Sequence, residues 1–240
     1  METTADKSRA LADRVARAAE AALASDRSVS LVEVFMAIGW LDYFHMKRWR
    51  QGQEEDLESS MQVGEARLSE AMDLLQSWAT ARGLIASETP YVAQTPRRQA
   101  LRFSRSGDPE RERRYRTHWL SAELTDSQRA RLVEKASRPP ELVVVQSRHA
   151  EWTCHRCGST GGLLMMENPG PACLDCVGLG DLEFLGPGDA LLTRRAKAKS
   201  ARHAVVVKFS RARKRYERQG LLVEPQALAE AQREVAERKR

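Results

Sequence analysis

Residues 154–176 read CHRCGSTGGLLMMENPGPACLDC and contain all four cysteines of the 240-residue chain. Two Cys-x-x-Cys pairs, Cys154 with Cys157 and Cys173 with Cys176, are separated by fifteen residues. This spacing is typical of four-cysteine zinc sites, whereas disulfides usually link more distant elements of secreted domains. Four thiolates complete a tetrahedron and leave no position for water, so we expect one structural Zn²⁺ ion.

The residues around the pairs predict a zinc-binding module over 149–188. Gly158 follows the first pair directly and permits a tight turn, and residues 163–167 (LLMME) predict a strand before a turn at 168–171. Both a zinc ribbon and a treble clef fit this pattern. His155 is an alternative ligand, and a thioredoxin-like redox motif is less favoured because it needs only one such pair.

The preceding residues predict a helical domain over 1–121 and a helix–strand connector over 122–148. Helical periodicity predicts helices over 8–24, 30–38, 42–51 and 65–82, the second beginning with a Ser30–Glu33 capping box. Alternating patterns at 89–93 and 99–104 predict a β-hairpin, and 105–114 is a linker or the start of a charged helix. In the connector we expect a helix over 125–137 and a strand over 141–145.

Residues 34–52 have the outline of a helix-turn-helix, which a longer helix and a hairpin would extend to a winged helix. The alternative is an ordinary αα-hairpin with Trp40 and Trp49 in the core. In the winged-helix interpretation, Arg102 would also suit the wing. The cations of this second candidate nucleic-acid surface are Lys47, Arg48, Arg50, Arg97 and Arg98.

Positive charge is concentrated near the carboxy terminus. The chain has a formal net charge of +6, yet residues 190–220 alone hold eleven Lys or Arg and one acid, Glu217. Apolar residues at 201, 205, 209, 212 and 216 follow helical spacing and predict a basic helical tail over 189–240, despite the β-favouring Val205 to Val207. The cations expected to contact a polyanion are Arg194, Arg195, Lys197, Lys199, Arg202, Lys208, Arg211, Lys214, Arg215 and Arg218.

A dense cluster of one sign favours phosphate as a partner, so we expect non-catalytic binding of DNA or RNA. An adaptor that binds an acidic protein surface of a larger machine, such as polymerase or ribosome, fits the same charge. A solvated charged face is the ordinary alternative. An enzyme is not expected, since the five histidines are scattered and 158–172, where an HNH-type nuclease needs one, contains none.

The chain shows no apolar run near the roughly 18 residues that a membrane span needs, so no membrane partner is expected. Its first 25 residues are charged and alanine-rich, which predicts an amphipathic helix and not a signal peptide. Together with paired cysteines suited to metal in a reducing compartment, this predicts a cytoplasmic protein.

The amino-terminal half contains the runs IGWL (38–41), WRQG (49–52), SWATARGL (77–84) and LRFSRSGDPERERRYRTHWLS (101–121). These runs resemble segments of an uncharacterised bacterial protein family that contains a zinc ribbon. The segment from the cysteine pairs through residue 224 resembles one that precedes a carboxy-terminal domain of unknown function. The resemblance implies no activity. From all of these segments together, the fold class that we expect is a multi-module α+β protein, with a helical half, a zinc module and a basic tail.

Overall fold

The structure is a computed structural model that describes residues 4–147, 152–167 and 169–238. The described residues form a mixed α+β fold, as predicted, and the chain divides into two compact units. The first unit comprises residues 1–93 and 99–139, and the second comprises 94–98 and 140–240. Among the described residues, no helix is long and apolar enough to cross a membrane.

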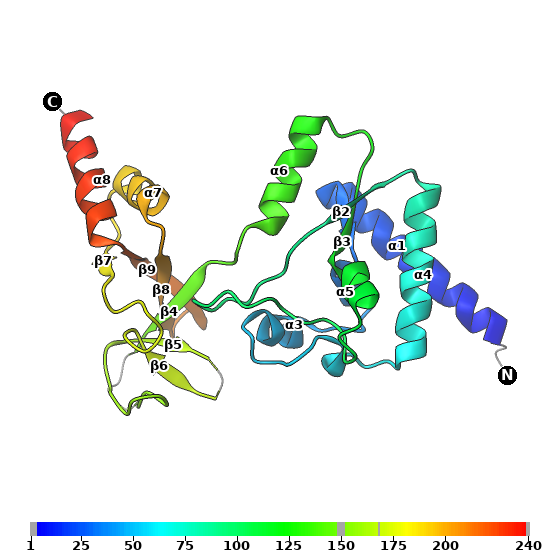
Figure 1. The fold of residues 1–240 in the computed structure, drawn as a ribbon, viewed down its shortest axis with the longest axis horizontal. Coiled ribbons are helices and arrows are strands. Elements are labelled where there is room, and N and C mark those ends of the chain that lie inside the picture. The colour runs from blue at the N-terminus through cyan, green and yellow to red at the C-terminus, as the bar shows by residue number, and fades with distance from the viewer. Residues whose placement is uncertain (1–3, 148–151, 168, 239–240) are drawn as a thin grey trace. The chain divides into compact units, whose positions relative to one another are not determined.

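The first unit packs helices against a small antiparallel sheet (Figure 1). Its helices are α1 (Thr4–Asp26), α2 (Leu31–Ala37), α3 (Tyr43–Arg50), a 3₁₀ turn η1 (Glu58–Ser60), α4 (Glu65–Ala81), α5 (Pro109–Arg116) and α6 (Asp126–Ser137). Its strands are β1 (Ser28–Ser30), β2 (Ile85–Glu88) and β3 (Thr117–Leu120), with β3 in the centre. The helices predicted at 8–24, 30–38, 42–51, 65–82 and 125–137 are thus confirmed within a few residues at each end.

Local capping explains where α2 begins and ends. The Ser30 hydroxyl accepts a hydrogen bond from the Glu33 backbone N–H, and the Glu33 carboxylate accepts one from the Ser30 N–H at 2.9 Å. This reciprocal pair is the predicted capping box, and it satisfies two free donors of the first turn. The helix stops before Gly39, whose φ of +77° suits glycine far better than other residues.

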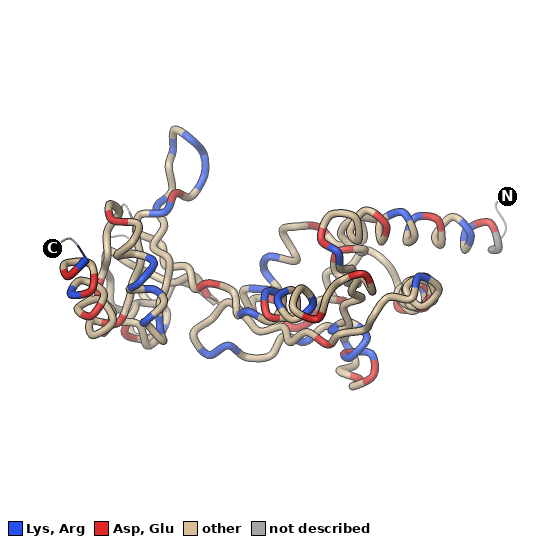
Figure 2. Tube along the Cα trace, turned by 90° about the horizontal axis from the view of Figure 1, so that it is seen from above, with Lys and Arg blue, Asp and Glu red and all other residues tan. Residues whose placement is uncertain are grey.

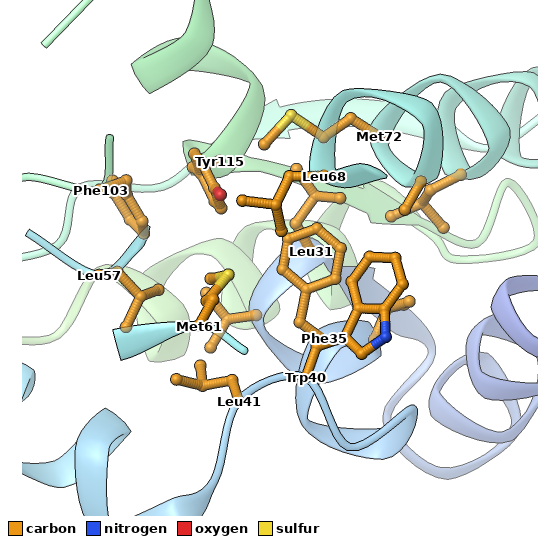
Figure 3. Packing of buried hydrophobic residues seen from close by; sticks show 14 of the residues in the cluster. Leu31, Phe35, Trp40, Leu41, Leu57, Met61, Leu68, Met72, Phe103 and Tyr115 are labelled. Carbon is orange, nitrogen blue, oxygen red and sulfur yellow. The ribbon is translucent and has the colours of Figure 1, made fainter. Parts of the chain in front are cut away.

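Aromatic and aliphatic side chains together form the core of the first unit (Figure 3). Phe103 and Tyr115 stack with ring centroids 5.0 Å apart, and the Trp49 indole packs on Phe103 and donates to the Arg102 carbonyl at 2.7 Å. Trp40 and Trp49 are both buried, as the αα-hairpin alternative predicts. The core therefore gathers residues from α2, α3, α5 and the connecting segments.

The hairpin predicted at 89–93 and 99–104 is present only in its inner part. Val92 and Ala100 form an isolated antiparallel bridge, the Ala93 N–H donates to the Gln99 carbonyl, and the Leu101 N–H donates to the Tyr91 carbonyl, both at 2.9 Å. Beyond Leu101 a side chain takes the place of a strand partner. The buried Glu112 carboxylate accepts the backbone N–H groups of Phe103 at 3.1 Å and of Ser104 at 2.6 Å. Glu112 belongs to α5, which confirms the charged-helix alternative for the segment that follows.

The second unit contains a six-stranded sheet in the order β6-β5-β4-β8-β9-β7, with two helices. Its strands are β4 (Leu142–Gln146), β5 (Leu163–Met166), β6 (Pro171–Cys173), β7 (Glu183–Leu185), β8 (His203–Ser210) and β9 (Arg215–Val223). Its helices are α7 (Ala190–Lys199) and α8 (Pro225–Arg238), which pack side by side (Figure 1). The strands predicted at 141–145 and 163–167 are confirmed. The predicted zinc module and the predicted tail contribute to one sheet.

The prediction of a basic helix through 201–216 is wrong, because residues 203–223 form the β8–β9 hairpin; among the described residues of the tail, only those of α7 and α8 are helical. Positions 201, 205 and 209 are four residues apart, so they share a face of a strand as well as of a helix. The β-branched Val205 to Val207 pack well in a strand, and their alternating side chains are buried on both faces of the sheet.

The two faces of this sheet cover different cores. Val205, Leu221 and Val223 pack with residues of α7 and α8 on one face. On the other, Ala204, Val206 and Leu222 pack with Val144 of β4 and with two of the cysteines, Cys154 and Cys173. The cysteine module is thus anchored on the sheet that carries the basic hairpin.

Candidate metal centre and basic hairpin

The four cysteines come together at one place, with their sulfur atoms all within 4.8 Å of one another. Cys154 and Cys157 lie on the turn that precedes β5, Cys173 ends β6, and Cys176 lies on the turn that follows. All four are free thiols. Sulfurs placed about 2.3 Å from an ion at the corners of a tetrahedron lie about 3.8 Å apart, and the Cys157–Cys173 separation is 3.6 Å. This arrangement could hold a metal ion.

Two similar turns position the pairs. The Gly158 N–H donates to the Cys154 carbonyl at 2.9 Å, and the Val177 N–H donates to the Cys173 carbonyl at 3.3 Å. Gly158 has a φ of +76°, which confirms that it provides the predicted turn after the first pair, and Gly178 has a φ of +74° two residues after the second. The Cys173 N–H donates to the Cys154 sulfur at 3.3 Å and so joins the two turns.

The electrostatics of the site favour thiolates at some of the cysteines but not at all four: hydrogen bonds with Ser159 lower the pKa of Cys157 as well. Burial raises the pKa of Cys154, but backbone N–H groups of Cys173, Cys157 and Arg156 oppose this and bring the pKa down to about 6. Hydrogen bonds with the Cys157 and Cys173 thiols raise the pKa of Cys176 to about 12. Four adjacent negative charges therefore require a cation between them, which a divalent metal ion supplies.

Arg156 and Glu167 fix the geometry around the cysteines, and sequence analysis had missed both. Arg156 holds the Glu167 carboxylate with two hydrogen bonds of 2.6 Å and donates to the Cys176 carbonyl at 2.8 Å. His155, the alternative ligand, has its Nε2 2.7 Å from the same carboxylate and is not among the residues whose donor atoms converge. The sequence signal that could have indicated these hydrogen bonds is an arginine between the two cysteines of a pair.

The structure divides the predicted contact cations into two groups. Those on and after α7 mostly have acidic partners within the second unit, some of them on α8. These ion pairs are Arg195–Glu234, Lys197–Glu141, Lys199–Glu230, Lys199–Glu234, Arg202–Asp181 and Arg202–Glu224. Their charge is already balanced, so they gain little from an added polyanion. Arg194 is exposed and has no ion pair with a described residue.

The second group lies on the β8–β9 hairpin. Lys208, Arg211, Lys214 and Arg218 have no ion pair with any described residue, and Arg215 lies 3.8 Å from Glu217. Arg213, which the predicted set had omitted, binds Glu217 at 2.8 Å. Figure 2 shows the turn between the strands as a mostly blue loop that projects from the second unit. We call residues 208–218 the basic hairpin.

The second candidate surface is not one cluster. Arg48 binds Glu54 at 2.6 Å, and the Arg50 guanidinium lies 4.9 Å from the centroid of the Tyr91 ring, which leaves Lys47 exposed. Arg98 belongs to the second unit, donates to the Pro140 carbonyl, and has its pKa lowered by burial. Its neighbour Arg97 is exposed in the same unit.

Comparisons with family models, with curated proteins and with solved structures give no match to this chain. The resemblance noted from the sequence therefore stays a prediction.

Proposed function

We propose that the cysteine site holds one structural Zn²⁺ ion in a zinc ribbon. Thiolates are soft ligands that suit zinc, and four of them close its coordination sphere. The β5–β6 hairpin lies between the two pairs, as in a ribbon. A treble clef would continue from the second pair into a helix, whereas residues 177–189 form turns and β7. Metal analysis of the purified chain tests this, with one zinc per chain expected.

We further propose that the chain binds nucleic acid without catalysis, through the basic hairpin. One observation carries this proposal: four cations of the hairpin have no ion pair with a described residue, whereas most of those near α7 are neutralised within the fold. Unpaired cations on a projecting strand pair displace counterions from phosphates, which favours binding strongly at low salt. A two-stranded ribbon is also an established shape for nucleic-acid contact.

The zinc site would set the direction of the hairpin. Cys173 ends β6, the first cysteine pair lies on the turn that precedes β5, β5 pairs with β4, and β4 pairs in parallel with β8 from Leu142–Ala204 to Val145–Val207. A metal that fixes the β5–β6 end of this sheet therefore also restrains the base of the hairpin. In this proposal zinc has no direct contact with the nucleic acid.

Charge removal at two places tests the interface. We expect Arg211→Gln with Lys214→Gln to weaken binding roughly tenfold near 0.1 M salt and to reduce the salt slope by about 1.5, because two phosphate contacts are lost. Arg195→Gln with Lys199→Gln removes the same formal charge from α7 and should change affinity little, since both residues are paired with Glu234. Fluorescence anisotropy over a salt series measures both.

Equal losses in the two variants would mean that net charge alone drives binding and would refute the interface. The alternative function, an adaptor that contacts an acidic protein surface, would be supported by two results together. The chain would bind no nucleic acid, and its protein partners in a pull-down would remain bound after nuclease treatment.

For the first unit, a winged-helix interpretation would have to use α4 as its third helix, since α4 precedes β2 and the sheet order is β1-β3-β2. The exposed side of α4 carries Glu65 and Asp73, and its one cation, Arg67, binds Glu70 at 2.7 Å. This helix therefore offers phosphate little attraction, and we assign nucleic-acid binding to the second unit.

A further inference from the structure

Two exposed aromatic side chains lie among the cations of the basic hairpin. Phe209 on β8 is directly opposite Tyr216 on β9, and their ring centroids are 5.3 Å apart with planes inclined at 68°. Phe209 is 41% exposed and Tyr216 is 55% exposed. Directly opposite residues of antiparallel strands project from the same face, so both rings offer π surface to solvent on one side of the hairpin.

The face of the hairpin that carries the two rings is continuous with the face of the sheet that α7 and α8 cover. Side chains alternate along a strand, so Phe209 projects from the same face as Val205 and Val207. Val205 is buried against the helices and Val207 is partly buried there, while Phe209 and Tyr216 belong to no buried cluster of the described residues. The aromatic pair therefore stands where an apolar face extends beyond its covering helices.

Cations surround the rings, and the one acid of the hairpin projects from the other face. Arg218 is opposite Val207 and so lies on the face of the rings, and Arg211 and Lys214 are in the adjoining turn. Glu217 is opposite Lys208 on the other face, where it binds Arg213 at 2.8 Å. A ligand that fits this face has negative charge together with flat, apolar rings.

We propose that Phe209 and Tyr216 are a stacking platform for unpaired bases, so that the chain prefers single-stranded nucleic acid. This rests on the proposed function and specifies its substrate class. Nucleic acid combines phosphates with aromatic bases, and stacking of bases on aromatic side chains accompanies cationic grooves in proteins that bind single strands. In a duplex the bases already stack on one another, so a duplex offers its phosphates but not its base faces.

The test measures binding of the full chain to a labelled thymidine oligomer of about 16 nucleotides and to a blunt duplex of equal length. The variant Phe209→Leu with Tyr216→Leu keeps every charge and an apolar pair across the strands. We expect it to bind the single strand about tenfold more weakly or worse, and the duplex within about twofold of the unaltered chain. The salt slope should not change, because no phosphate contact is removed.

The matched control is Tyr43→Leu with Phe44→Leu, which removes two aromatic side chains that are even more exposed, 67% and 63%, from α3. It should leave single-strand affinity unchanged. Photocrosslinking to a strand that contains 5-iodouracil provides a second readout, with adducts expected in the peptide that carries Phe209 or Tyr216.

The outcomes separate the two proposals. If the unaltered chain binds neither oligomer, the proposed function fails. If it binds both equally and the leucine variant changes nothing, the platform is refuted while phosphate binding by the hairpin stands. Loss of single-strand affinity in both leucine variants would also overturn the platform as the specific site. Selective loss in the hairpin variant, with crosslinks to the hairpin peptide, supports it.

Discussion

His118 lies on the central strand of the first unit and is kept neutral by its surroundings. Its Nε2 is 2.7 Å from the Tyr91 hydroxyl, and its ring centroid lies 5.8 Å from that of Tyr91. Burial, with a smaller contribution from the Arg50 charge, lowers the pKa of His118 from 6.5 to about 4. Burial likewise raises the pKa of Tyr91 to about 12, so this pair stays uncharged near neutral pH.

This pKa predicts a loss of stability in acid. Because the folded-state pKa of His118 is below its unfolded value, its contribution is complete above about pH 6.5 and falls until about pH 4. Over that range we expect up to about 3 kcal/mol of unfolding free energy to be lost. Denaturant unfolding can be followed by tryptophan fluorescence, since four of the five tryptophans lie in the first unit.

In His118→Gln the loss between these pH values should be smaller by about the same amount, because glutamine cannot bind the proton. Carboxylates titrate in both proteins and cancel in the comparison. Parallel pH profiles for the two proteins would show that His118 is not the group responsible.

At the scale of elements, Gly220 allows β7 to approach β9 where the free part of the hairpin begins. A Cβ built on Gly220 would lie 2.3 Å from the Leu185 carbonyl oxygen and 2.7 Å from the Phe184 ring. The register between β8 and β9 shifts at the same position along the strands, between Val206 and Val207, as in a β-bulge. Such irregularities redirect the strands beyond them, so this point sets how the basic hairpin leaves the sheet.

We therefore expect Gly220→Ala to destabilise the second unit by about 1–3 kcal/mol, because the carbonyl cannot move away without separating β7 from β9. Gly162→Ala is the matched control, since a Cβ there meets no atom of a described residue within 4 Å. Thermal unfolding of the two variants compares them, and equal midpoints would contradict the close approach.

At the scale of the whole molecule, the two units should respond differently to loss of metal. The cysteines share a core with β4, β8 and β9, whereas the core of the first unit contains none of them. If zinc supplies folding energy to the second unit, a chelator or Cys157→Ser should expose the amides of 163–173 and 203–223 to exchange. The amides of 65–81 should keep their protection.

Hydrogen–deuterium exchange with mass spectrometry measures these segments separately. His155→Gln is the control, because its imidazole contacts Glu167 and not the sulfurs; it should retain one zinc and normal protection. Uniform loss of protection in both units after chelation would refute independent folding of the first unit. Unchanged protection at 163–173 would refute a structural metal.

The features that the sequence determined by itself are those whose causes lie within a few residues. The capping box at Ser30 and Glu33, the helix ends before Gly39 and Gly83, and the Cys-x-x-Cys turns all depend on neighbours in the chain. Hydrogen bonds of this range follow directly from local residue types, and two matched cysteine pairs with suitable spacing predict that they meet.

Only the tertiary structure decided which distant partners meet. The apolar spacing at 201, 205 and 209 fits a helix and a strand equally, and pairing of β8 with β4 selected the strand. The same holds for charge. Arg195 and Lys199 look as available as Arg211 in the sequence, yet they meet Glu234, more than thirty residues away, whereas Arg211 forms no ion pair with a described residue. Burial and ion pairing depend on the three-dimensional neighbours of a side chain, which the local pattern does not contain.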